Sequence, residues 1–184
     1  METSFYYATD DKQLCFNLRE KVTTRGNFEL KAKGRFNPSI GELKYRGHAK
    51  KNVVIGSEDK TEPGSKPLTL GLGAALASGT TEPVLAASVK KQLALLDGPN
   101  TVLSAKLEVD ASFKSGKAVR DCLSLKLSHK AMNFTKRQDL KLSVGVDVEG
   151  ITAGKPKPMP RAQLRENNWA AHYRWNKMYV TYDL

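Results

Sequence analysis

Apolar and polar residues alternate strictly along much of this chain. From Asn27 to Phe36, NFELKAKGRF, the residues Phe, Leu, Ala, Gly and Phe take the even positions, and Glu, Lys, Lys and Arg separate them. The segment LSAKLEVDASFK, from Leu103 to Lys114, repeats the pattern. Side chains of a β-strand point alternately to opposite faces, so each segment has one apolar and one charged face. A helix would scatter the same residues around its axis.

The same period of two predicts an all-β, antiparallel, up-and-down chain that forms a single domain over residues 1–184. Turn signals separate the strands, among them Asn37-Pro38, the polar loop at 57–67, the turn at 97–100 and KPKPMP at 155–160. A hairpin unit of roughly fifteen residues fits about twelve strands, with ten as the minimum. The clear strands lie at 14–18, 28–36, 43–49, 68–76, 85–89, 103–113, 123–127, 140–148, 169–175 and 178–184.

Two all-β architectures share this alternation. In a soluble sandwich or barrel the apolar face is inside, whereas in a transmembrane β-barrel it faces lipid. The runs at 103–114 and 139–149 match the ~9 to 11 residues that cross a bilayer at a tilt, and they exceed an average strand. Small residues share the charged face at 69–77, which suits a narrow lumen. Aromatic residues near strand ends resemble interfacial girdles, namely Phe5, Tyr6, Tyr7, Phe36, Trp169, Trp175, Tyr179 and Tyr182.

If the barrel lies in a membrane, the energetics fix which face is wet. A Lys or Arg on the lipid face at mid-bilayer costs about 2 to 4 kcal/mol. If Lys31, Lys33 and Arg35 pointed outward, each of the three side chains on this one strand would add such a free-energy cost. These cations are therefore expected to line an aqueous interior, where they raise the local concentration of anions.

The chain is strongly basic, with 30 Lys and Arg against 19 Asp and Glu and a formal charge of +11. Its partners are therefore expected to be anions: nucleic acid, an anionic lipid surface or phosphorylated metabolites. The amino terminus has neither the basic, apolar pattern of a secretory signal nor the Arg-rich pattern of a transit peptide. The sequence alone thus predicts no cleaved targeting segment.

The sequence offers no convincing catalytic or metal-binding motif. Cys15 and Cys122 lack metal-ligand spacing, and His48, His129 and His172 do not form a histidine motif. A dinucleotide-binding fold requires a helix directly after its glycine motif. No helix pattern follows Gly71-x-Gly73, so this fold is excluded. We expect two free thiols, no enzyme, no metal and no cofactor.

A soluble all-β module that binds nucleic acid or another polyanion is the alternative. A basic sheet with interleaved aromatic residues is how single strands are held. In the clearest strand, however, Phe28 and Phe36 lie on the face opposite Lys31 and Arg35. Stacking and phosphate contacts would then fall on different faces, which disfavours nucleic acid as the partner.

The last third of the chain carries a family resemblance. LRENNWAAHYRWNKMYVTYDL, from Leu164 to Leu184, AMNFTKRQDLKLSVGVDVEG, from Ala131 to Gly150, and the opening METS are the segments that carry it. Together they resemble the twenty-one-kilodalton outer envelope pore proteins of plant chloroplasts. The resemblance implies a β-barrel in the chloroplast outer envelope, inserted without a cleaved transit peptide and forming an anion-selective channel. It implies triose phosphate, 3-phosphoglycerate, inorganic phosphate and nucleotides such as ATP as cargo, with ATP also acting as a regulator.

Strand parity, rather than the resemblance, predicts the residues that set selectivity. The partners expected on this reading are phosphorylated small anions and membrane lipid, and the chain is expected to act as a monomer or weak oligomer. Acidic residues share the charged faces, so we expect selectivity to come from clusters of cations, with 31–46 forming one wall. The predicted anion-binding, lumen-lining residues are Lys31, Lys33, Arg35, Lys44, Arg46, Lys106, Lys126, Lys130, Lys141 and Arg174.

Overall fold

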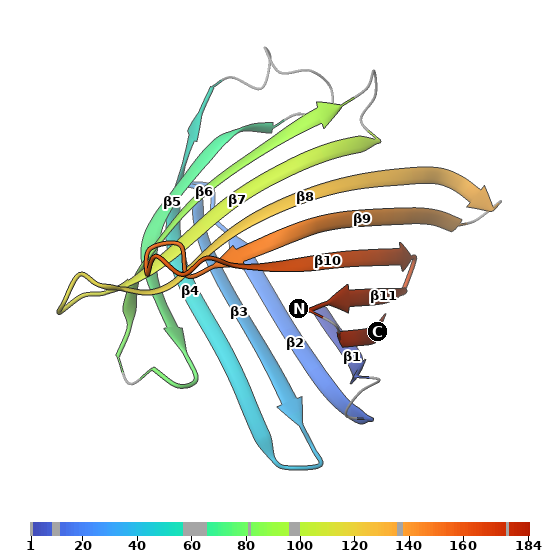
Figure 1. Ribbon diagram of the computed structural model, residues 1–184, viewed down its shortest axis with the longest axis horizontal. Helices are drawn as coiled ribbons and strands as arrows, with labels where there is room; N and C mark the ends of the chain where they lie inside the picture. The colour runs from blue at the N-terminus through green and yellow to red at the C-terminus, as the bar shows by residue number, and fades with distance from the viewer. Residues whose placement is uncertain are drawn as a thin grey trace.

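The protein is a closed barrel of twelve antiparallel strands (Figure 1). This computed structural model describes residues 2–8, 12–56, 66–80, 82–95, 100–135, 138–175 and 177–184, with only the backbone at 132–135 and 138. In the described residues there is no helix of the length and apolarity needed to cross a membrane. The strands are β1 (Glu2–Ala8), β2 (Gln13–Thr23), β3 (Phe28–Asn37), β4 (Glu42–Ile55), β5 (Lys66–Ala77), β6 (Val84–Leu95), β7 (Thr101–Ser112), β8 (Ala118–Thr135), β9 (Gln138–Glu149), β10 (Lys157–Glu166), β11 (Trp169–Arg174) and β12 (Lys177–Asp183).

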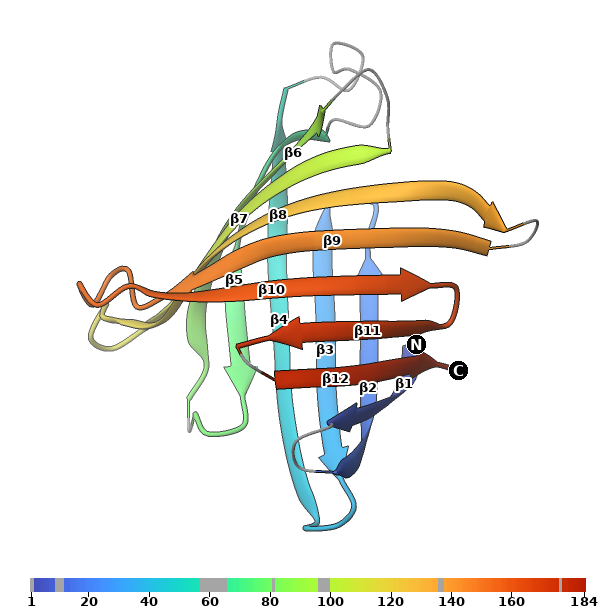
Figure 2. The ribbon, with the colours of Figure 1, turned by 45° about the vertical axis from the view of Figure 1, so that its right-hand side comes forward.

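Each strand pairs with its neighbours in the chain, and the first strand pairs with the last to close the barrel. At this seam the register runs from Ser4 opposite Asp183 to Ala8 opposite Tyr179. The two termini accordingly lie close together, and strands β9 to β12 lie across the interior from β3 and β4 (Figure 2). The predicted all-β, up-and-down barrel of about twelve strands is confirmed.

Side-chain contacts between strands that are not neighbours identify the inner face. Arg46 on β4 reaches Asp110 on β7, with 2.6 Å between the guanidinium nitrogen and the carboxylate oxygen. Arg35 on β3 lies over the ring of Tyr6 on β1, 4.0 Å from its centroid. Such contacts are made only through the interior, so the charged face of β3 points inward. Its apolar face points outward, and the register extends this assignment around the barrel.

Burial is inverted relative to a water-soluble protein. Large apolar side chains are exposed on the outer face, with Leu72 at 59% and Leu142 at 50% of full exposure. No large side chain is fully buried in the described part of the chain, and the buried apolar residues there are alanines and cysteines. Buried polar residues on the inner face include Lys50 and Asp147. An apolar outside around a polar inside is stable in a bilayer, where every backbone group is paired within the closed sheet.

The sequence pattern missed two strands and markedly shortened four others. It gave no strand at β1 or β10, it ended β2, β4 and β6 before the structure does, and it shortened β8 at both ends. Residues 51–55 and 131–135 continue β4 and β8 as extended strands. Of the predicted polar loop at 57–67 and the predicted turn at 97–100, residues 57–65 and 97–99 lie outside the described residues.

The interpretation of KPKPMP as a turn is wrong for its second half, because Lys157 to Pro160 open β10. Pro158 and Pro160 pair with Val148 and Val146 of β9 on one side. On the other side, the pairing with β11 begins only at Arg161. The prolines therefore occupy a stretch that is locally an edge, where the missing N–H removes no ladder hydrogen bond.

The aromatic girdle is also corrected at two positions. Tyr6 and Tyr179 point into the barrel, where their ring centroids are 4.7 Å apart and His172 stacks on Tyr179 at 4.4 Å. Their positions in β1 and β12 place them on the face opposite their neighbours Tyr7 and Tyr182, which are exposed on the outside. Proximity to a strand end, without parity, could not separate lipid-facing from lumen-facing rings.

Candidate functional site: the basic lumen

The inner faces of β2, β3 and β4 form a continuous cationic wall. In one row across the three strands Arg19 lies beside Lys33, and Lys33 lies beside Arg46. In the next row Arg35 lies beside Lys44. Like charges directly opposite on neighbouring strands are destabilising. Contacts between these strands therefore do not explain the arrangement, and its effect falls on ions in the lumen.

This wall faces a cavity of about 820 Å³ inside the barrel. The side chains around it include the aromatic rings of Tyr6 and Tyr179 and two carboxylates, Glu2 and Asp183. The cations around it come from β2, β3, β4 and β10, and they outnumber the carboxylates three to one. They are Arg19, Lys33, Arg35, Lys44, Arg46 and Arg165.

The register places every predicted lumen residue on the inner face, but half of them are paired with acids. The other half has no carboxylate partner in the described part of the chain. Among these, Arg35 donates to Asn17 at 3.1 Å and lies over the ring of Tyr6. Within those described residues, no carboxylate lies within ion-pair distance of Lys31, Lys33, Lys126 or Lys141. The paired cations are Lys44 with Glu42 (3.1 Å), Arg46 with Asp110 (2.6 Å), Lys106 with Glu108 (2.8 Å), Lys130 with Asp139 (2.7 Å) and Arg174 with Asp147 (3.2 Å).

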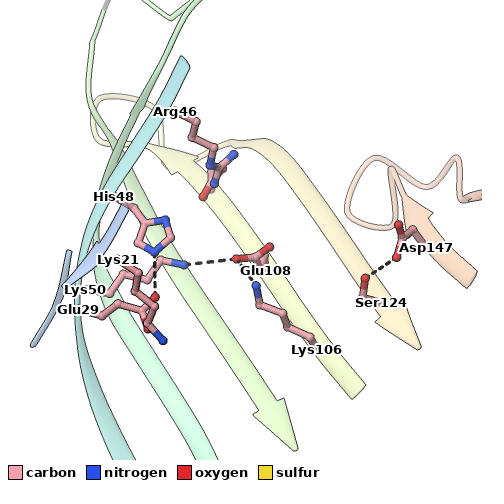
Figure 3. A network of polar contacts seen from close by, with 10 residues as sticks. Lys21, Glu29, Arg46, His48, Lys50, Lys106, Glu108, Ser124 and Asp147 are labelled. Carbon is pink, nitrogen blue, oxygen red and sulfur yellow. Dashed lines mark hydrogen bonds and ion pairs between the residues drawn. The ribbon is translucent and has the colours of Figure 1, made fainter. Parts of the chain in front are cut away.

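Ion pairs bridge β4 and β7 across the interior, over the intervening β5 and β6 (Figure 3). Besides the Arg46–Asp110 pair, the Lys50 ammonium lies 3.7 Å from Glu108, which also accepts from Lys106 at 2.8 Å. The side chain of Lys50 is only 3% exposed. We call this set the β4–β7 bridge; it occupies one side of the barrel and leaves the cavity beside the cationic wall open.

The small inner-face residues of β5 and β6 make room for this bridge. A Cβ added to Gly71 would lie 2.6 Å from the Asn52 side-chain oxygen, and one added to Gly73 would lie 1.9 Å from the Ala49 carbonyl oxygen. Ala86, the next inner residue along the row, is fully buried. The stripe of small residues that the sequence indicated is therefore where β4 side chains pass over to β7.

A second cluster lies on β2, β3 and β4 around one carboxylate. Glu29 accepts from Lys21 at 2.9 Å through one oxygen and lies 3.1 Å from the ring nitrogen of His48 through the other (Figure 3). Lys31 is the inner-face neighbour of His48 and of Lys21 in the register. One acid thus engages two basic neighbours here, and Lys31 keeps its charge uncompensated.

Parity alone could have found the inner-face cations that the sequence interpretation missed. Most of them lie where a recognised strand continues with the same parity. Exceptions lie on β10, a strand hidden by its prolines. The missed residues are Arg19, Lys21, Lys50, Lys66, Lys90, Arg120, Lys157, Arg161, Arg165 and Lys177.

The described residues contain no cluster of His, Cys, Asp and Glu that could hold a metal ion. Cys15 and Cys122 are both free and buried. His129 lies on the outer face beside Thr101, whereas His48 and His172 lie in the lumen.

A protein-family model described as the chloroplast outer envelope pore protein OEP21 matches residues 3–184, nearly the whole chain. This chain belongs to that family. It is a pore protein of the chloroplast outer envelope, and its barrel is the membrane-spanning unit. The match favours the membrane channel over the soluble-module alternative. A search of curated protein sequences gave no significant match.

Solved structures of porins share the fold of this pore protein. A structure titled "KdgM porin" aligns over 100% of this chain and 96% of its own, with a TM-score of 0.60 and 8% identity. "KdgM porin in complex with disordered oligogalacturonate" gives 0.56 at 9% identity and the same coverage. "NanC porin structure in rhombohedral crystal form" gives 0.54 at 7% identity, covering 100% and 99%. At these identities the likeness shows the fold alone.

Proposed function

We propose that this pore protein is an anion-selective channel that passes small phosphorylated metabolites through its basic lumen. The class includes triose phosphate, 3-phosphoglycerate and inorganic phosphate, with ATP as a larger member. The observation that carries the proposal is the excess of cations around the open cavity, where six basic side chains, among them the adjacent Arg19, Lys33 and Arg46, face the carboxylates of Glu2 and Asp183. The family supplies the pore, and the charge of its wall supplies the preference.

Electrostatics gives the mechanism. Cations that line a water-filled path with low-dielectric walls attract anions and repel cations, and the effect weakens as salt shortens the Debye length to about 10 Å at 0.1 M. Lys106 on β7 lies in the interior beside Glu108, which also contacts Lys50 on β4. A permeating anion therefore meets cations from β7 as well as from the cationic wall. Because Lys33, Arg35 and Lys44 are exposed to the lumen, an anion that enters is also able to leave.

The experiment that tests the function is the reversal potential of the purified full chain in a planar bilayer under a KCl gradient. We expect a reversal potential of the sign set by chloride, and a decline in selectivity as the salt on both sides is raised. A zero reversal potential, or one of the sign set by potassium, contradicts the proposal. If the protein conducts ions without preferring anions, it is still a pore. That result would refute anion selectivity and leave pore formation intact.

Replacing Glu108 by Gln is expected to increase the anion preference. The Glu108 carboxylate compensates both Lys50 and Lys106. Removing it leaves two lysines facing the lumen with one negative charge fewer. We expect the chloride-to-potassium permeability ratio to rise by about twofold, the effect of one charge acting through water-like dielectric. An unchanged ratio would show that the bridge does not face the conduction path. A lower ratio would contradict the electrostatic mechanism.

The remaining partners follow from the same wall. Membership of a pore family points away from catalysis, and we infer a channel without enzyme activity or cofactor. ATP as a regulator is supported by the match between its phosphates and the cationic rows, and membrane lipid is the partner of the outer face. Nucleic acid is disfavoured, because Phe28 and Phe36 lie on the outer face, away from the cations. We infer a monomer or weak oligomer, since one chain closes its own sheet.

A further inference from the structure

A second, smaller group of cations lies on the wall opposite the cationic wall, in a single register row. Lys126 on β8 lies beside Gly145 on β9, Gly145 lies beside Arg161 on β10, and Arg161 lies beside Arg174 on β11. Neighbouring strands are about 4.8 Å apart, so Lys126 and Arg161 flank a gap about two strand spacings wide. Gly145 adds no side chain between these two cations.

Backbone packing requires a glycine at position 145. A Cβ there would lie 2.2 Å from the carbonyl oxygen of Leu125, so no larger residue fits without moving β8. A cavity of about 140 Å³ is lined by the basic side chains on either side of this glycine, Lys126, Arg161 and Arg174.

Hydrogen-bonding groups line the cavity between the cations. Along the inner face of β9, Ser143 precedes Gly145, and on β10 Gln163 lies directly opposite Ser143. The phenol of Tyr179 and the ring of His172 complete the lining. Ser143 already donates its hydroxyl to Ser128 at 3.2 Å. The donors left to the cavity therefore come from Gln163, Tyr179 and the basic side chains, and its volume has room for one tetrahedral oxyanion.

One carboxylate lies at the cavity, and it is already compensated. Asp147 is only 5% exposed. It forms ion pairs with Arg161 at 3.4 Å and Arg174 at 3.2 Å, and it accepts a hydrogen bond from the hydroxyl of Ser124. Arg174 also lies 4.0 Å from Glu149. Asp147 therefore orients the two guanidinium groups and leaves the cavity net positive.

The two basic groups on either side of the gap keep unused capacity. Lys126 has no carboxylate partner within the described ranges, and the charged groups that act on it most strongly are other cations, Lys141 foremost. The Nε of Arg161 is buried and has no hydrogen-bond partner among the described atoms. A buried donor without a partner costs about 1 to 3 kcal/mol. An anion that bound here would meet both an unpaired ammonium and a guanidinium with a free donor.

We propose that this cavity, which we call the Lys126–Arg161 pocket, is a discrete binding site for a phosphate dianion, either free or as the phosphate group of a larger metabolite. The inference rests on the proposed anion channel and adds a site to it. A single cation is enough to attract a spherical chloride ion. A tetrahedral dianion binds more tightly where several charge-assisted donors surround it. The pocket would hold the phosphate group while the rest of the metabolite extends into the lumen.

Binding of inorganic phosphate to the full chain in detergent micelles tests the pocket, followed by the broadening of the phosphorus-31 NMR signal. We expect saturable broadening that glycerol 3-phosphate reverses. Lys126→Gln removes a charge without breaking an ion pair, and Gln163→Leu removes a donor without changing the charge. We expect the half-saturating concentration to rise about tenfold for Lys126→Gln and about threefold for Gln163→Leu, as for lost charged and neutral hydrogen bonds.

The matched control is Lys141→Gln, which removes an equally unpaired lysine that does not line the pocket. It is expected to change phosphate binding about twofold, the effect of one charge about 10 Å away in water, which is well below the tenfold change expected for Lys126→Gln. Equal shifts for Lys126→Gln and Lys141→Gln, no shift for Gln163→Leu, or failure of glycerol 3-phosphate to compete would each overturn the pocket. The reversal potential is recorded on the same proteins. Intact anion selectivity with no phosphate saturation refutes the pocket alone, whereas saturation in a non-selective pore refutes the channel function alone.

Discussion

Replacing Lys31, Lys33 and Arg35 together by Gln is expected to move the reversal potential in a KCl gradient toward zero. None of the three is neutralised by a carboxylate in the described part of the chain, and two of them line the large cavity. One unit charge acting over about 10 Å in water contributes about 0.4 kcal/mol, or about twofold, so losing three fixed charges should lower the chloride-to-potassium permeability ratio about tenfold. The measurement is the reversal potential, repeated at low and high salt.

Two controls isolate the charge of this wall. Exchanging Lys for Arg at 31 and 33 and Arg for Lys at 35 keeps every charge, and it should keep the reversal potential. Replacing Lys51 and Lys91 by Gln removes charge from the outer face, where the register places both residues, and it should leave selectivity unchanged. An anion preference that survives the triple neutral change would exclude the β3 wall from the selectivity mechanism.

Replacing Gly73 by Ala is expected to prevent the barrel from folding normally. The added methyl carbon would lie 1.9 Å from the Ala49 carbonyl oxygen and 2.7 Å from the Lys50 Cα, and both atoms belong to the backbone of the paired strand. Relief requires β4 and β5 to separate, which breaks the ladder beneath the β4–β7 bridge. Overpacking usually costs about 1 to 3 kcal/mol, and a clash with backbone lies at or beyond the upper end.

The measurement for Gly73→Ala is the urea midpoint of the folded, heat-modifiable band on a gel, after refolding into detergent. Gly47→Ala is the matched control, because a Cβ at Gly47 has its nearest contact at 4.0 Å. That variant should be unchanged or slightly more stable, by about 0.4 to 1 kcal/mol, since alanine has less backbone freedom in the unfolded chain. Equal midpoints for the two variants would show that β4 and β5 are not packed as closely as described.

The fold was largely predictable because a period of two is a local property. The alternation at 28–36 and 103–113 fixes which side chains share a face, whatever the partner strand is. What it cannot do is detect a strand whose pattern is interrupted. Prolines at 158 and 160 hid β10, and they are tolerated only because β11 ends before it reaches them. That tolerance depends on the length of another strand, which no local pattern encodes.

The site was predictable as a set of faces and not as a set of contacts. Parity placed both Lys33 and Arg46 in the lumen, but their charges are compensated differently. Lys33 has no carboxylate partner in the described part of the chain, whereas Arg46 forms an ion pair with Asp110. That difference depends on β4 and β7 approaching each other over β5 and β6, a distance set by the shape of the closed barrel. The register that aligns Lys126, Gly145 and Arg161 is likewise a property of three paired strands.

The seam between β1 and β12 has a kinetic consequence. Its five residue pairs join segments from the two ends of the chain, so they are the most non-local contacts in the fold and are expected to form late. Until they form, both strands present bare backbone edges that hydrocarbon does not accept and that another copy can pair with. The final closing step and edge-to-edge association therefore compete for the same hydrogen bonds. Dilution and slow delivery to the membrane should favour the closed pore, whereas crowding should favour chains that share an edge.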